Sequence, residues 1–198
     1  MKKIIEHFKQ FELSVKYMHT DHEMRNFQSL MASKGISLPE SYYEFINYFG
    51  SVFIMSEAAI KCKHKIPNIT IDEHEYGFIS VGIFMNFTNN DFSINKTIES
   101  LCPEQFPEDF IPFAEDNGDY LGFKFHPDGK YYIALWAHEA PPFNDTFLIA
   151  DDFESFILSI VPYKFKIPDN VKFLPVEEKL TPKMVEFLKK TGQWNKEE

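Results

Sequence analysis

The chain has 198 residues, of which 44% are hydrophobic and 17% aromatic, including 22 phenylalanines. A chain of this length buries roughly 70% of the surface that it exposes when unfolded, and this composition excludes an intrinsically disordered protein. The net charge is −10 and Arg25 is the sole arginine. Nucleic acid is therefore a poor partner, because there is no basic stripe and no set of guanidinium groups to bind phosphate.

Neither a signal peptide nor a membrane-spanning segment is expected. Glu6, His7 and Lys9 interrupt the first residues, where a signal peptide has an unbroken apolar run. No stretch approaches the roughly 18 apolar residues that a membrane-spanning helix needs. Cys62 and Cys102 are the only cysteines, and neither lies in a CxxC pair. We expect reduced thiols, rather than a disulfide or a reactive thiol, in a cytoplasmic protein that does not contact a membrane.

Two helices are predicted at the N-terminus. Apolar residues recur at helical spacing over residues 2–17, which predicts an amphipathic helix. Thr20 followed by Glu23 matches a capping box, in which each of these residues satisfies a backbone N–H of the other. This pattern predicts a second helix that extends toward Gly35.

Residues 38–50 predict a third helix. Pro39 suits a first helical position, the apolar residues form one face, and Gly50 can take the left-handed conformation that ends a helix. Strands are then expected at 52–55, at 58–63 as an edge strand or a loop, and within 76–87, followed by a loop that becomes helical over 89–102.

Tight turns separate the strands predicted in the second half of the chain. Asp116-Asn117-Gly118 and Pro127-Asp128-Gly129 contain the dipeptides that tolerate the positive φ of hairpin turns. They predict three antiparallel strands, at 110–114, 120–125 and 130–136. The remaining predicted elements are a strand at 147–150, a helix over 153–160 that Pro162 ends, and a last helix from Thr181 to near Gly192.

Three stretches, in order and with similar spacing, resemble the SUKH superfamily, which groups the Smi/Knr-like proteins with many bacterial immunity proteins. The Leu-Pro helix and following glycine of the family are similar to LPESYYEFINYFGS at 38–51. Its strands, joined by a Gly-Asp and an Asp-Gly turn and ending in Trp-x-His-[Glu/Asp], are similar to FIPFAEDNGDYLGFKFHPDGKYYIALWAHE at 110–139. Its closing helix is similar to IADDFESFILSI at 149–160.

The resemblance implies an α+β fold in which a mostly antiparallel sheet is packed by helices. We expect a single domain over 1–198, with a core at 36–161, an N-terminal helical extension at 1–35, and a C-terminal appendage with a last helix at 162–198. The resemblance also implies a binding role, because bacterial members are commonly immunity proteins that neutralise toxins of contact-dependent or polymorphic systems, many of them nucleases. The family has no common catalytic residues.

Most of the negative charge lies in one segment. Residues 99–155 hold 13 acidic residues and only two basic ones, Lys124 and Lys130. The leading hypothesis is an immunity protein whose acidic face binds a basic toxin; the alternative is a scaffold or regulatory module that binds an endogenous partner. If the turns share an edge of the sheet, the candidate contacts are Glu115, Asp116, Asp119, Asp128, Glu139 and Asp145.

Catalytic and metal-binding interpretations have less support. His19, His22 and Glu23 could share a helical face and bind a metal, but the capping box accounts for Glu23, and three ligands from one helical turn rarely enclose zinc. Carboxylates such as Glu115 and Asp119 could act as acid and base, yet acidic residues around turns are usually solvated turn formers. No nucleophile or phosphate-loop motif occurs. We expect no enzymatic activity, no metal and no cofactor.

Trp136 and His138 allow two interpretations. An aromatic residue beside charges at a strand end can be an interface hot spot. Alternatively, Trp136 fills the core and His138 satisfies a loop carbonyl, and for Trp136 we favour the core. The role of Glu139 stays open between these interpretations.

Overall fold

The computed structural model describes residues 2–63, 66, 78–88, 93–101, 107–140, 145–164 and 190. The chain divides into two units, Met1–Lys164 and Phe165–Glu198, and every helix and strand given below belongs to the first. The helix predicted from Thr181 to near Gly192 lies outside the described residues, apart from Lys190.

The described helices match most of the helical predictions. They are α1 (Lys2–Phe8), α2 (Asp21–Ser33), α3 (Glu40–Phe49), α4 (Ile94–Leu101) and α5 (Phe153–Ser159). The capping box of α2 is confirmed: the Glu23 N–H donates to Thr20 Oγ1 at 3.3 Å, and the Thr20 N–H donates to Glu23 Oε2 at 2.8 Å. In α3, Pro39 occupies the N-cap, one residue before the helical position predicted for it, and Gly50 ends the helix with φ +68°.

The prediction of one helix over residues 2–17 is wrong in its second half. The helix ends at Phe8, and Leu13–Tyr17 form strand β1, which pairs antiparallel with β2. Val15, one of the apolar residues whose spacing over 2–17 predicted the helix, is 53% exposed. The short segment satisfies its backbone groups on the edge of a sheet, and tertiary pairing of this kind overrides local spacing.

A seven-stranded sheet, with order β1-β2-β5-β6-β7-β8-β9, is the main layer, and a second sheet has the order β10-β3-β4. All of the paired strands are antiparallel. Their bounds are β1 Leu13–Tyr17, β2 Ser51–Ile54, β3 Ala58–Lys61, β4 Phe78–Ser80, β5 Ile83–Phe84, β6 Phe110–Asp116, β7 Asp119–Phe125, β8 Tyr131–Trp136, β9 Thr146–Ala150 and β10 Ile160–Pro162.

Two predicted elements differ from the observed ones in detail. The run 76–87 contains two short strands, β4 and β5, which belong to different sheets. Helix α5 ends at Ser159 rather than at Pro162, because Ile160–Pro162 pair with β3. Proline is tolerated at the end of a short edge strand, because it has no backbone N–H to donate to a neighbouring strand.

Both predicted hairpin turns are confirmed. Asn117 and Gly118 have φ of 53° and 90°, and Gly129 has φ of 81°. Next to the first turn, Asp116 of β6 lies opposite Asp119 of β7. Next to the second, Phe125 of β7 lies opposite Tyr131 of β8. The turn dipeptides therefore determine how the central three strands pair.

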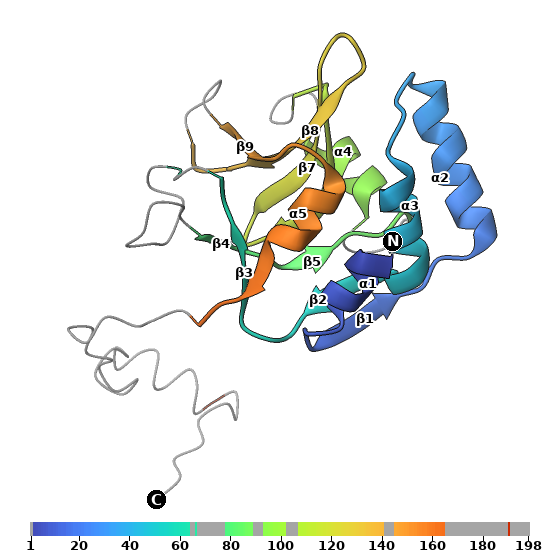
Figure 1. Ribbon diagram of the computed structural model, residues 1–198. Helices are drawn as coiled ribbons and strands as arrows, with labels where there is room; N and C mark the ends of the chain where they lie inside the picture. The colour runs from blue at the N-terminus through green and yellow to red at the C-terminus, as the bar shows by residue number, and fades with distance from the viewer. Residues whose placement is uncertain are drawn as a thin grey trace, which may run out of the picture. The chain divides into compact units, whose positions relative to one another are not determined.

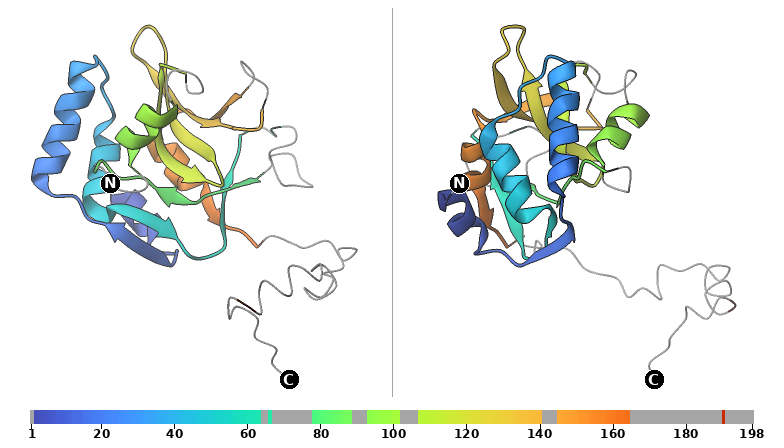
Figure 2. Two further views of the ribbon diagram at one scale, coloured as in Figure 1. Left: turned by 180° about the vertical axis from the view of Figure 1, so that it is seen from behind. Right: turned by 90° about the vertical axis from the view of Figure 1, so that its right-hand side faces the viewer.

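The core lies between the large sheet and helices α1, α3 and α5. Figures 1 and 2 place α5 on one face of this sheet and α4 on the other. The largest side chains that are fully buried include Phe8, Tyr42, Phe45, Phe84, Phe113, Phe123, Phe153 and Phe156. This arrangement is the α+β fold that was expected. None of the helices among the described residues is both long and apolar enough to cross a membrane.

Candidate protein-binding surface

The two hairpin turns lie at opposite ends of β7. The β6–β7 turn precedes Asp119 at the start of β7, and the β7–β8 turn follows Phe125 at its end. A strand of this length spans about 20 Å. The premise that the acidic turns share one edge of the sheet is therefore wrong for Asp128, which the structure places away from the other candidate residues.

The turn that holds Asp128 carries its own positive charges. The Asp128 carboxylate accepts hydrogen bonds from the Lys130 ammonium at 2.9 Å and from the Lys130 backbone N–H at 3.1 Å. These bonds, the side-chain one first, lower the pKa of Asp128. Lys124 pairs with Asp109 near the same end of the hairpin. The two lysines of the acidic segment are thus both engaged here, and each pairs with one of the carboxylates at this end.

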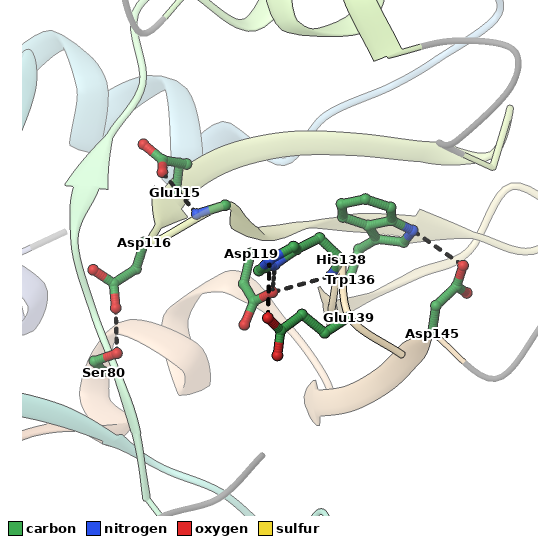
Figure 3. A network of polar contacts seen from close by, with 9 residues as sticks. Ser80, Glu115, Asp116, Asp119, Trp136, His138, Glu139 and Asp145 are labelled. Carbon is green, nitrogen blue, oxygen red and sulfur yellow. Dashed lines mark hydrogen bonds and ion pairs between the residues drawn. The ribbon is translucent and has the colours of Figure 1, made fainter. Parts of the chain in front are cut away.

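The other end of the same strands gathers the remaining candidates. Glu115 and Asp116 end β6, Asp119 begins β7, Glu139 follows β8, and Asp145 precedes β9. Figure 3 shows these residues around one end of the sheet. We call this group of five the carboxylate end. No lysine or arginine among the described residues forms an ion pair with any of its members.

Two of these carboxylates accept hydrogen bonds that stabilise the structure around the β6–β7 turn. Glu115 accepts a hydrogen bond from the backbone N–H of Gly118 at 3.1 Å, which closes the β6–β7 turn. Asp116 accepts a hydrogen bond from the Ser80 hydroxyl, which ties the turn to β4 (Figure 3). Their positions are fixed by these bonds, while their charge is not cancelled by them.

His138 joins the two turns of the carboxylate end. Its backbone N–H donates to Asp119 Oδ1 at 3.0 Å, and its Nδ1 lies 2.7 Å from the same oxygen. Its Nε2 lies 3.8 Å from Glu139 Oε1, and the Glu139 side chain is 88% exposed. The sequence suggested a carbonyl partner for His138, whereas the observed partner is a carboxylate. Glu139 is thus the most accessible charge of this pair of turns.

Trp136 is buried and forms a hydrogen bond with one member of the carboxylate end. It is 5% exposed, and its indole N–H donates to Asp145 Oδ2 at 3.2 Å (Figure 3). The Thr146 hydroxyl donates to the second oxygen of Asp145, also at 3.2 Å. The burial of Trp136 agrees with the core interpretation and not with an exposed hot spot. Its hydrogen bond orients Asp145 at the start of β9.

Comparison with known proteins decides the family. A model of the SMI1 / KNR4 family (SUKH-1) matches residues 20–159. The chain belongs to this family. It is also similar to the SPbeta prophage-derived uncharacterized protein YokK of Bacillus subtilis (strain 168), with 24% identity over 199 residues that cover 90% of this chain and 96% of the relative. No solved structure matches the chain significantly.

The SUKH-1 match contains the whole carboxylate end. It begins before α2, whereas the sequence resemblance started at residue 36, and it leaves out α1 and β1. Strand β1 nevertheless completes the edge of the large sheet of this SUKH-1 protein. Membership of this family implies a protein partner, so the carboxylate end, in which Glu139 is exposed and the other four carboxylates are partly exposed, is the feature to weigh first.

The described residues of this SUKH-1 chain offer no metal centre. No group of three or more His, Cys, Asp and Glu side chains among them is placed to hold a metal ion. His19 stacks on Phe87 at a ring distance of 4.4 Å, and Glu23 is engaged in the cap of α2. His22 instead faces Asn26, with 3.1 Å between its Nε2 and the amide nitrogen. These three residues, which the sequence raised as ligands, do not form a site.

The environment of His19 predicts a pH-dependent stability. Burial lowers the pKa of His19 from its ordinary value of 6.5 to about 4, and neither ring nitrogen has a hydrogen-bond partner among the described residues. The unfolded chain therefore binds more protons between these values, so the free energy of unfolding should fall as pH is lowered from about 6.5 to about 4. His19→Phe should keep the ring stack and remove this part of the fall.

Urea unfolding of both proteins at several pH values between about 4 and 7 measures this difference. His22→Phe is the matched control, because it removes an imidazole on the surface of α2. As pH is lowered through this range, the free energy of unfolding of wild type should fall relative to that of His19→Phe. Parallel curves would contradict the buried position of the His19 ring.

Proposed function

We propose that this chain is a non-enzymatic immunity protein that binds and neutralises a bacterial polymorphic or contact-dependent toxin through its carboxylate end. The observation that carries the proposal is the gathering of five carboxylates at one end of the sheet, with no lysine or arginine ion pair to them among the described residues. Membership of the SMI1 / KNR4 family and similarity to a prophage-derived protein support the same assignment.

A basic toxin domain, such as a nuclease, is the partner that this charge pattern suits. Complementary charges raise the rate of encounter by about 10 to 10³-fold at low ionic strength, and an inhibitor of a toxin must bind before the toxin acts. Because long-range attraction is screened over about 8 to 10 Å at physiological salt, the effect depends on ionic strength. Rapid, salt-sensitive association is therefore the expected signature of this surface.

The test begins with the reading frames next to the gene of this chain: a neighbouring frame that encodes a toxin domain supplies the partner, and the absence of one favours the scaffold or regulatory role. Co-expression of the chain should protect a host from that toxin, and the purified pair should form a complex. Protection without any complex would contradict neutralisation by binding. A chain that neither protects nor binds would contradict the immunity function and favour the scaffold or regulatory role with an endogenous partner.

Charge reversal then tests the surface. Glu139→Lys should lower the association rate by about tenfold at low salt and flatten its dependence on salt, because it reverses the most exposed charge of the carboxylate end. Asp128→Lys, at the far end of the same hairpin, is the matched control and should change the rate by about twofold or less. Stopped-flow association at several salt concentrations measures these rates. Equal effects of the two variants would contradict a localised acidic interface.

A further inference from the structure

A row of side chains crosses the large sheet on the face opposite to α1, α3 and α5. Its members are neighbours across successive strands: Ser14, Phe53, Ile83, Glu115, Tyr120, Trp136 and Thr146. Alternate residues on the same strands, such as Val52, Phe84 and Leu121, belong to the main core. Because side chains alternate between the faces of a strand, the row lies on the other face.

The row changes from apolar to acidic side chains at β6. Phe53 on β2 and Ile83 on β5 are apolar, and Glu115 on β6 is the next member. At this change the surface holds a groove of about 510 Å³. The described residues that line it are Lys16, Phe53, Met55, Ile83, Glu115, Asp116 and Asn117. One side of the groove is therefore apolar, and the other belongs to the carboxylate end.

The apolar side of the groove exposes one large side chain to solvent. Met55, just after β2, is 54% exposed, while Ile83 beneath it is buried. A volume of this size lies within the range of roughly 300–1,000 Å³ that small-ligand pockets have. A flexible thioether can adapt to differently shaped apolar groups, and methionine is common at binding surfaces for this reason. The groove is thus suited to receive a hydrophobic side chain.

The charges at the rim indicate what accompanies that side chain. Glu115 and Asp116 line the groove and are also part of the carboxylate end, so the two features form one continuous surface. Lys16, on the opposite rim, is the only basic residue among the described lining residues. An apolar group that enters beside Glu115 and Asp116 would place a neighbouring cation within reach of both carboxylates.

We propose that the groove receives a hydrophobic anchor from a partner segment in which lysine or arginine flanks the anchor. This inference rests on the proposed function, since it names the chemistry of the segment that the carboxylate end attracts. The carboxylates raise the rate at which the partner associates, and the buried contact in the groove slows its dissociation. The partner is thereby a basic and amphipathic segment rather than a uniformly basic surface.

The peptide acetyl-Lys-Phe-Lys-amide is a probe that needs no toxin. The full chain contains seven methionines, so spectra of the ¹³C-labelled methionine methyl groups are simple, and loss of one signal in Met55→Ser assigns Met55. The Met55 signal should shift as the peptide is added, with a dissociation constant of about 1 mM. The Met18 signal is the matched control, because Met18 is 50% exposed and does not line the groove, and it should stay in place.

Two further peptides separate the apolar and ionic parts. Acetyl-Glu-Phe-Glu-amide keeps the ring and reverses the charge, and acetyl-Lys-Ser-Lys-amide keeps the charge and removes the ring. Each should bind at least about fivefold more weakly than the Lys-Phe-Lys peptide. Glu115→Gln should weaken the Lys-Phe-Lys peptide and strengthen the Glu-Phe-Glu one, because it removes an attraction in the first case and a repulsion in the second. Equal shifts of Met55 and Met18, or no shift of Met55, would overturn the inference.

Two other occupants of the groove would also overturn the inference, and each would give a different experimental result. A change of the Met55 signal on diluting the free chain would assign the groove to a second copy of the chain. Nuclear Overhauser contacts between the Met55 methyl group and residues 165–198 in the free chain would assign it to those residues. Failure of the toxin-binding experiment is independent of these outcomes, because the peptide probe reports on the groove alone.

Discussion

Phe113→Ala is expected to lower the free energy of unfolding by about 3 to 5 kcal/mol, which is the range for removing a buried aromatic ring. Phe113 is fully buried on β6. Its ring contacts those of Phe123 at 4.9 Å, Phe156 at 5.2 Å and Tyr42 at 5.9 Å. The side chain therefore joins the sheet to both α3 and α5, and its loss leaves a cavity that rigid neighbouring rings cannot fill.

Urea unfolding followed by circular dichroism measures the loss. Leu148→Ala on β9 is the matched control, because Leu148 is 40% exposed and its truncation should cost less than about 1 kcal/mol. A loss of the same size in both variants would contradict the position of Phe113 at the centre of the core. Binding by any Phe113→Ala protein that remains folded should be preserved, since the carboxylate end lies at the strand termini.

Gly50→Ala is expected to cost at least about 3 kcal/mol of unfolding free energy. Gly50 ends α3 with φ +68° and ψ −154°, a conformation that is essentially restricted to glycine. A β-carbon at this position would lie 2.1 Å from the backbone oxygen of Tyr17 and 2.8 Å from the Met18 sulfur. The substitution therefore combines backbone strain with a clash against the end of strand β1.

Gly35→Ala separates these two contributions. Gly35 also has a positive φ, +71°, but a β-carbon there would have no neighbour within 4 Å. Only the conformational cost of about 1 to 2 kcal/mol is expected for this control. Thermal or urea unfolding of the two variants measures the difference. Equal losses would contradict a clash between the added β-carbon at residue 50 and the end of β1.

Local chemistry accounts for the elements that sequence reasoning placed correctly. The capping box of Thr20 and Glu23 satisfies the first N–H groups of α2 whatever surrounds it. Asn117-Gly118 and Gly129 adopt the positive φ values that the hairpins need. Such signals depend on residues a few positions apart in the chain, so they can be recognised without knowledge of the fold.

The candidate surface was predictable only in part. The sequence identified the acidic segment, and the positions of Glu115, Asp116, Asp119, Glu139 and Asp145 at one end of the sheet follow from the order of antiparallel strands. Asp128 was grouped with them because the premise of a shared edge ignored that consecutive turns of a meander alternate between ends. The groove was missed altogether, because Val52, Phe53 and Ile54 are all apolar in the sequence, and only the burial pattern of β2 shows that Phe53 is the less buried of the three.

The sequence by itself determined the hairpin turns and the concentration of acidic residues, because these depend on local spacing and on composition. It also carried the SUKH resemblance, which implied the α+β class. Only the tertiary structure decided that residues 13–17 form an edge strand, that Asp128 lies apart with Lys130, and that Phe53, Ile83 and Glu115 become neighbours. The physical reason is strand pairing: backbone hydrogen bonds bring together residues that are distant in the chain, and local patterns specify the neighbours only of strands that a tight turn joins.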